Sequence, residues 1–164
     1  MTAGELPGDA GPLGALILAA VAGGGLGGVL DIGAACLMFR RGPATILQSI
    51  ASGLVGPGQA FGGGAPMMVL GAIAHLLIAI IVAFAFILLA QRWPLLWSNL
   101  WMGAAGLGVA TYLVMNLIVV PLSRAQTPPA TPIAVVIGVA VHILVFALPI
   151  VWVTRAILRQ VPAA

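Results

Sequence analysis

Four long apolar runs constrain this chain more than any other feature of its sequence. A helix needs about 20 consecutive apolar residues to cross the hydrocarbon core of a bilayer, and each run reaches that length. Charged residues make up only 5% of the chain, whereas soluble domains carry about 25%. The sequence therefore predicts an all-α integral membrane protein, a four-helix transmembrane bundle within residues 13–158. The expected spans are residues 13–39, 67–90, 100–120 and 133–158.

Shorter segments complete the expected organisation. Residues 1–12 are rich in glycine and proline and lack the positive stretch of a signal peptide, so we expect a disordered tail there. Glycines interrupt the linker between the first two spans, but its residues 45–55 can form a helix with Ile46 and Ile50 on one side. This helix is expected either to lie at the membrane interface or to form a re-entrant turn that caps the bundle.

Basic residues bear on partners and orientation. All six are arginines, which against three acids give a net charge of +3. This basicity suits anionic headgroups at helix ends, so the expected partner is the lipid bilayer and not nucleic acid. The arginines divide evenly between the two faces of the predicted bundle, and the positive-inside rule therefore does not fix its orientation. An even number of spans places both termini on the same side.

The two histidines lie in similar segments, GAIAHLL and GVAVHIL, which contain His75 and His142. Each histidine follows a glycine by four residues. The preceding spans also match, because Asp31 in the first span and Asn116 in the third precede an arginine by nine and eight residues. These matches predict two helical hairpins related by an axis along the membrane normal, which is a parallel internal repeat.

Helix rise places one polar residue of each span at a common depth. Asp31, His75, Asn116 and His142 are all expected roughly 12–15 Å below the same surface, at about 1.5 Å per residue. A charged group at that depth costs a few kcal/mol, so it is expected to face the bundle interior and find a partner. Tyr112, one turn before Asn116, is expected to join them. The sequence therefore predicts a buried polar site.

Three interpretations of this site stay open. In the first, the side chains form a hydrogen-bonded knot that fixes helix register, worth about 0.5–2 kcal/mol per interhelical bond. In the second, His75 and His142 ligate a haem or other tetrapyrrole, the preceding glycines leaving room for the macrocycle, or hold a metal ion with Asp31. In the third, Asp31 and the histidines exchange protons along a proton or solute path.

No enzyme motif accompanies these residues. Ser49 and Ser52 have no histidine at the same depth, and the glycines at 62–64 lack the lysine of a phosphate-binding loop. A lipid-modifying activity at the loop surface would involve Arg41, Gln48 and Gln59. We therefore expect no catalytic site and keep Arg41, Gln48, Ser49 and Ser52 as loop candidates.

Small residues in the first span favour close helix packing. Residues 23–28 contain five glycines, which give two pairs at a separation of four residues. We expect Ala104 and Gly108 of the third span to pack against them.

Several strings carry a resemblance to a known group: LDIGAACLMFRRG, ILQSIASGLVG, AFGGGAP, GAIAH and YLVMNLIVVPLS. They resemble those of small uncharacterised four-span inner-membrane proteins of bacteria, and the resemblance covers residues 13–158. It implies a bacterial inner (cytoplasmic) membrane and brings no activity with it. It also implies that the strings QSIASG and MN contribute to whatever these proteins do. Gln48, Ser49 and Ser52 lie in the first string and Asn116 in the second.

The sequence thus predicts a small integral membrane protein with a non-enzymatic, structural or accessory role. It is expected to act as a homo-oligomer or within a larger membrane complex. Haem or metal binding and a proton path through Asp31 are the alternatives.

Overall fold

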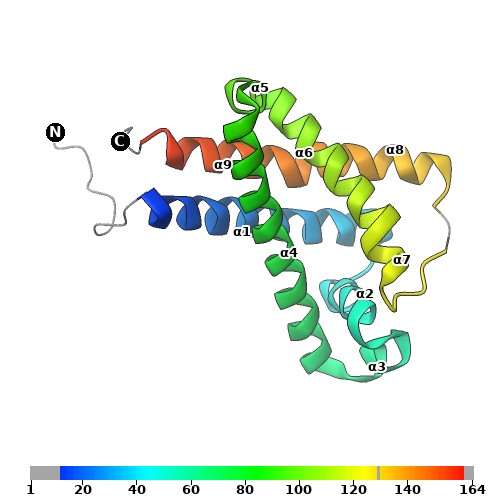
Figure 1. The fold of residues 1–164 in the computed structure, drawn as a ribbon. Coiled ribbons are helices and arrows are strands. Elements are labelled where there is room, and N and C mark those ends of the chain that lie inside the picture. Colours follow the sequence, from blue (N-terminus) through cyan, green and yellow to red (C-terminus); the bar gives the residue numbers. More distant parts are fainter. Residues whose placement is uncertain (1–11, 129, 161–164) are drawn as a thin grey trace.

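The computed structural model describes residues 12–128 and 130–160, and every regular element in these residues is a helix (Figure 1). The elements, with η marking π-helices, are α1 (Pro12–Phe39), α2 (Pro43–Val55), α3 (Pro57–Gly62), α4 (Gly64–Arg92), α5 (Pro94–Ser98), α6 (Leu100–Val114), η1 (Met115–Val119), α7 (Val120–Leu122), α8 (Pro132–Val141), η2 (His142–Ala147) and α9 (Leu148–Leu158). The tail predicted for residues 1–12 lies outside the described residues, apart from Pro12, which begins α1.

Four stretches of helix are long and apolar enough to cross a membrane, and the predicted all-α four-helix architecture is confirmed. They are Leu13–Phe39, Gly64–Arg92, Leu100–Leu122 and Pro132–Leu158. The second stretch is longer at both ends than predicted. It continues to Arg92 because the first strong stop is Pro94, which disfavours the helical conformation of the residue before it. Trp93 accordingly leaves the helix with φ −122° and ψ 89°.

The helices form two crossed layers. α1 lies beside η2 and α9 and runs antiparallel to them, while α4 and α6 cross in front of this pair (Figure 1). α1 packs against α4 and α9, and α6 packs mainly against η2 and α9. Consecutive spans therefore form two hairpins, which the contact between α1 and α9 joins. A repeat that relates the hairpins stays a prediction.

Glycines of α1 bring its backbone against two different helices. A Cβ atom on Gly24 would lie 2.6 Å from Ile80 Cα of α4, and one on Gly27 would lie 2.6 Å from the Phe146 carbonyl oxygen of η2. Carbon atoms pack at about 3.5–4.0 Å, so only glycine permits these approaches. Gly28, one turn after Gly24, also packs on α4. Gly23, one turn before Gly27, packs on α9, and Gly27 contacts Ile150 of the same helix. We call Gly24 and Gly28 the α4 ridge, and Gly23 and Gly27 the α9 ridge.

The expectation that Ala104 and Gly108 pack against the first span is wrong. A Cβ atom on Gly108 would lie 2.6 Å from Ile143 Cα, so α6 approaches η2 instead. The physical reason is that α4 and α9 already occupy both glycine ridges of α1. The third span therefore finds its close contact on the fourth.

Two π-helical segments interrupt the third and fourth spans, each just before a proline. In η1 the Val120 N–H donates to the Met115 carbonyl, and in η2 the Leu148 N–H donates to the Ile143 carbonyl. Pro121 and Pro149 follow directly. A proline ring clashes with the carbonyl four residues earlier, and widening the preceding turn relieves that clash. The fourth span thus widens at the turn that begins with His142.

The predicted linker helix is present as α2 and packs along α4. Gly71 of α4 contacts the carbonyl group of Leu47, which leaves no room for a side chain there. At the other end of α2, the Arg124 backbone N–H donates to the Gly53 carbonyl at 2.8 Å and ties the loop after α7 to this helix. Its interfacial or re-entrant position in a membrane stays a prediction.

The largest core cluster lies where α1, α4, η2 and α9 meet. Most of its members are alanines, so the helices approach closely and gain van der Waals contact, which drives association where lipid tails remove the hydrophobic advantage. The buried members are Ala19, Ala20, Ala79, Ala83, Ile87, Phe146, Ala147 and Ile150.

Candidate functional site

Asp31 lies one turn beyond both glycine ridges of α1. Gly28, three residues earlier, faces His75 and its neighbours in α4, and Gly27, four residues earlier, faces Phe146 in η2. α4 crosses α1 here, and η2 runs antiparallel to α1, so the next turn of α1 lies near the turn of His75 on one side and the turn of His142 on the other (Figure 1). Close packing therefore brings the Asp31 carboxylate against His75 and onto the side of the bundle where His142 lies.

Asp31 and His75 lie at salt-bridge distance without a hydrogen bond, and the contact is an ion pair only when the imidazole is protonated. The His75 Nε2 atom lies 3.7 Å from the Asp31 Oδ2 atom, and the two side chains keep 17% and 18% of their surface exposed. The same Nε2 atom lies 3.0 Å from the Gly28 carbonyl oxygen. Since a carbonyl can only accept, the neutral ring carries its proton on Nε2. Its Nδ1 atom then has a free lone pair.

His142 contacts the site from the fourth span. Its Nδ1 atom lies 2.9 Å from the carbonyl oxygen of Gly138, so the neutral ring carries its proton on Nδ1 and leaves Nε2 as an acceptor. Asp31 interacts electrostatically with His142 as well as with His75. Tyr112 of α6 meets the His142 ring edge to face, with centroids 5.4 Å apart and an interplanar angle of 86°. These four residues, His75, Asp31, His142 and Tyr112, are called the polar cluster below, and they come from four helical segments.

Asn116 is not part of this cluster, and its predicted place in a buried polar layer is wrong. Its side chain is exposed, and its amide donates to the Tyr112 carbonyl of its own helix at 2.9 Å. The physical reason is the π-helical segment η1, which contains Asn116. A five-residue bond spacing changes the direction of each side chain relative to a regular α-helix.

The space beside each histidine is filled, which does not fit a tetrapyrrole. A Cβ atom on Gly138 would lie 2.7 Å from the Tyr112 ring, and Gly71 is covered by the backbone of Leu47 in α2. Neither glycine leaves room for a macrocycle above His75 or His142, and the His75 Nε2 atom is engaged with Gly28. The alternative of a metal ion held by Asp31 and both histidines is not supported either, because no three His, Cys, Asp or Glu side chains of residues 12–128 and 130–160 are grouped to hold an ion.

The loop candidates lie at the other end of the molecule from the tryptophans, on or just before α2. Arg41 and Ser49 are exposed, Gln48 is half-buried and Ser52 is buried. The Ser52 hydroxyl donates to the Ser49 carbonyl at 2.6 Å, a local helical bond. This bond satisfies the hydroxyl and gives it no activating base, so the geometry provides no nucleophile.

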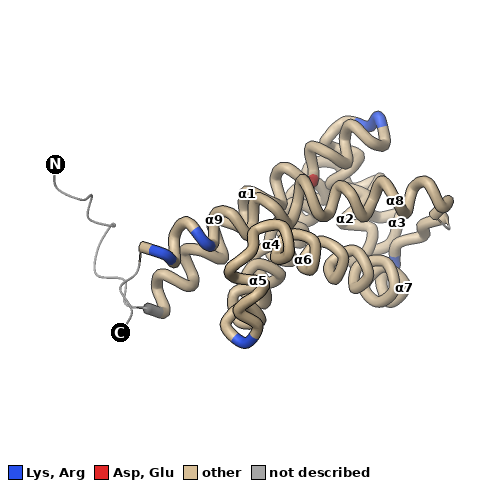
Figure 2. Tube along the Cα trace, turned by 90° about the horizontal axis from the view of Figure 1, so that it is seen from above, with Lys and Arg blue, Asp and Glu red and all other residues tan. Residues whose placement is uncertain are grey.

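A buried cation, Arg155, was not recognised as distinctive from the sequence. Its side chain is only 8% exposed, its Nη2 atom donates to the Ser98 carbonyl at 3.1 Å, and its Nη1 atom is buried with no hydrogen-bond partner among the described residues. Figure 2 shows the arginines at the ends of the helices and the one described acid, Asp31, within the helical body. One feature of the sequence could have identified Arg155 as a buried cation: it lies inside an apolar span, one turn before Arg159.

An apolar crevice of ≈ 490 Å³ opens at the same end of the molecule, between α1, α4, α5 and α9. Its lining holds no titratable side chain and consists of Ala15, Leu16, Ile87, Ala90, Gln91, Pro94, Trp97 and Leu158. Such a lining can accommodate a hydrocarbon chain and offers no side chain for acid–base or nucleophilic catalysis.

Comparison with known protein families, with curated proteins and with solved structures gives no match to this chain. The class therefore rests on the fold and the site alone. They define an all-helical, multi-pass membrane protein with an ionisable cluster where its helices cross.

Proposed function

We propose that this chain is a non-enzymatic membrane module, a structural or accessory subunit whose polar cluster fixes the register of its four spans. One observation carries the proposal: the Asp31 carboxylate of α1 lies 3.7 Å from the His75 imidazole of α4, and His142 of η2 interacts electrostatically with the same carboxylate. Polar groups inside a membrane find partners or destabilise the fold. Here the partners come from different helices, so the cluster joins both hairpins.

The supporting contacts are of a structural kind. Each histidine donates to a backbone carbonyl, and Tyr112 fills the space above Gly138. A site for a bound substrate needs an open cavity with polar groups directed into it. The crevice between α1, α4, α5 and α9 is apolar and lies among other residues.

The proposed setting is the bacterial inner membrane, with both termini on the same side and a second copy or a larger complex as partner. The setting is supported by the resemblance of several strings to four-span bacterial proteins. The start of α1 and the end of α9 lie side by side (Figure 1), which suits two termini on one side.

The test compares Asp31→Asn with Gly33→Ala, measured as the free energy of unfolding in detergent. Asp31→Asn keeps the shape of the side chain and removes its charge, so we expect a loss of about 0.5–2 kcal/mol, the range for one intramembrane polar contact. Gly33 is the matched control, because a Cβ atom there meets nothing within 4 Å. Alanine at position 33 should gain about 1 kcal/mol in helix propensity, and an Asp31→Asn protein as stable as the wild type would refute the register role.

A proton path is the second candidate, favoured by the free lone pairs on His75 Nδ1 and His142 Nε2. Neither atom has a hydrogen bond within the described residues, and Asp31 stands near both rings. The test is proton flux into liposomes that contain the purified protein and a pH-sensitive dye. Flux that exceeds empty liposomes, disappears in Asp31→Asn and persists in Gly33→Ala would support this candidate. A wild-type rate equal to that of empty liposomes would rule it out.

A further inference from the structure

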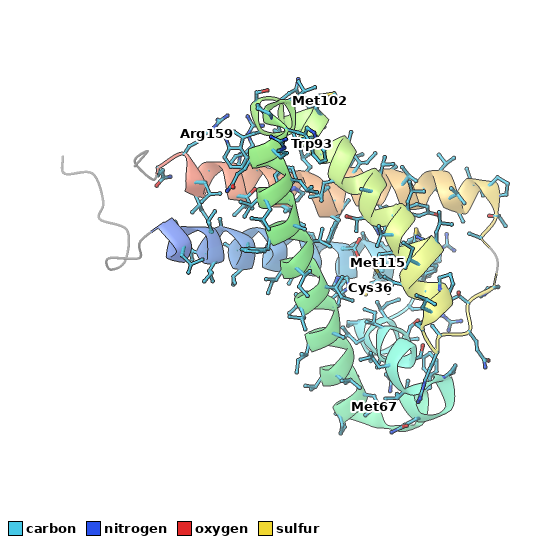
Figure 3. All side chains as sticks on the ribbon, viewed as in Figure 1. Cys36, Met67, Trp93, Met102, Met115 and Arg159 are labelled. Atoms are coloured by element: carbon cyan, nitrogen blue, oxygen red, sulfur yellow. The ribbon has the colours of Figure 1, made fainter. Side chains whose placement is uncertain are left out.

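Arg155 and Arg159 line a shallow pocket at the end of the fourth span. The pocket has a volume of ≈ 160 Å³ and is bounded by Leu100, Trp152, Arg155, Ala156 and Arg159. Arg159 lies at the end of α9, at the same end of the molecule as Trp93 and Met102 (Figure 3). Tryptophans and arginines together mark the interface between hydrocarbon and headgroups.

The state of Arg155 points to a missing anion. Burial of a guanidinium is costly unless it is paired, and Arg155 is only 8% exposed. Its protein bond is to the Ser98 carbonyl, a neutral acceptor, and Nη1 has no partner among the described residues. Asp31, the one acid among those residues, pairs with His75 inside the bundle. An anion in the pocket would satisfy this charge.

We infer that this pocket binds the phosphate of an anionic phospholipid. Two guanidinium groups one helical turn apart match the oxygens of a phosphate, because Arg binds such groups through paired N–H donors. Leu100 and the exposed Trp152 provide an apolar rim for the glycerol and the start of the acyl chains. The Nη1 atom is buried at the pocket that Arg155 lines, so a bound headgroup reaches it through a local movement of side chains. This inference does not depend on the role of the polar cluster.

The test titrates the full chain in detergent with phosphatidylglycerol, phosphatidylcholine or inorganic phosphate, and follows bound lipid by native mass spectrometry. We expect phosphatidylglycerol to bind the wild type about tenfold more tightly than phosphatidylcholine, the effect of one charge-assisted contact. Arg159→Gln, on an exposed residue, should remove this preference while the protein stays folded. Arg155→Gln should do the same, and Arg155→Lys should recover only part of it because the ammonium lacks the planar fork.

Arg92→Gln is the matched control, since Arg92 is exposed at the same end of the molecule and lies outside the pocket. Equal binding of the two lipids, or equal effects of Arg92→Gln and Arg159→Gln, would overturn the inference. Saturation by inorganic phosphate in the same concentration range would overturn the lipid assignment and leave a free-anion site.

A double variant, Glu5→Gln with Asp9→Asn, tests whether an acid of the chain itself satisfies Arg155. The inference would fail if this variant lowered the melting temperature as much as Arg155→Gln.

Discussion

Substitution of Gly24 tests the crossing of α1 and α4 most directly. A Cβ atom there would lie 2.6 Å from Ile80 Cα and 2.7 Å from the Ala79 carbonyl oxygen. Both are backbone atoms, so no side-chain rotation can relieve the clash. Gly25, the next residue in the same helix, has nothing within 4 Å of its added Cβ atom. The pair of variants Gly24→Ala and Gly25→Ala therefore differs in packing alone.

The expected effects have opposite signs. In Gly24→Ala the two helices must separate by about 1 Å to reach normal carbon contact. Overpacking costs about 1–3 kcal/mol, and a clash with backbone belongs at the upper end. Alanine gains about 1 kcal/mol over glycine in helix propensity, so the net loss is about 2 kcal/mol. Gly25→Ala keeps the gain without the clash, which leaves the two variants about 3 kcal/mol apart.

The assay is reversible unfolding of the purified protein in mixed micelles of mild detergent and dodecyl sulfate, followed by circular dichroism. Wild type, Gly24→Ala and Gly25→Ala are compared at equal detergent composition. A Gly24→Ala protein as stable as Gly25→Ala would refute the close contact between α1 and α4. If both variants were less stable than the wild type by the same amount, the close contact would again be refuted. Substitutions in this glycine segment would then act through backbone flexibility.

Three further predictions address other parts of the fold. Gly138→Ala should destabilise by about 1–3 kcal/mol through overpacking against the Tyr112 ring, and Tyr112→Leu in the same chain should recover part of the loss in a double-mutant cycle. Asn99→Ala should cost about 1 kcal/mol, because the Asn99 side chain accepts two backbone N–H groups at the start of α6 and caps that helix. Haemin added to the purified protein should give the same absorption spectrum with wild type, His75→Ala and His142→Ala, since the glycines that would admit a macrocycle are filled. A Soret shift lost in both histidine variants would contradict that last expectation.

The fold was accessible from the sequence because bilayer thickness sets helix length. Apolar runs and prolines therefore located all four spans, and the paired glycines of α1 indicated close packing. The partners of those glycines were not accessible in the same way. A glycine ridge accepts any small surface, and the choice of α4 and α9 over α6 depends on how all four helices cross.

The site could be predicted only in part, for reasons of helix geometry. Asp31 and His75 follow a regular α-helical rise, so counting residues placed them at one level. Asn116 lies in a π-helical segment before Pro121, where that count no longer gives the direction of the side chain. Arg155 was treated as one of several cations at helix ends. Its burial depends on the packing of α5 and α6 over α9, which no local pattern encodes.

In the proposed register role, the polar cluster and the glycine ridges act together. Gly28 lacks the Cβ atom that would push α4 away, and its carbonyl is the acceptor for His75. The distance of 3.7 Å between His75 and Asp31 exists only while this close approach is kept. In a bilayer, where apolar contacts alone barely distinguish one helix register from the next, a slip by one turn would cost both the glycine contacts and the contact between His75 and Asp31. The coupling of the two explains how a chain built mostly of small and aliphatic residues can define a single arrangement of its helices.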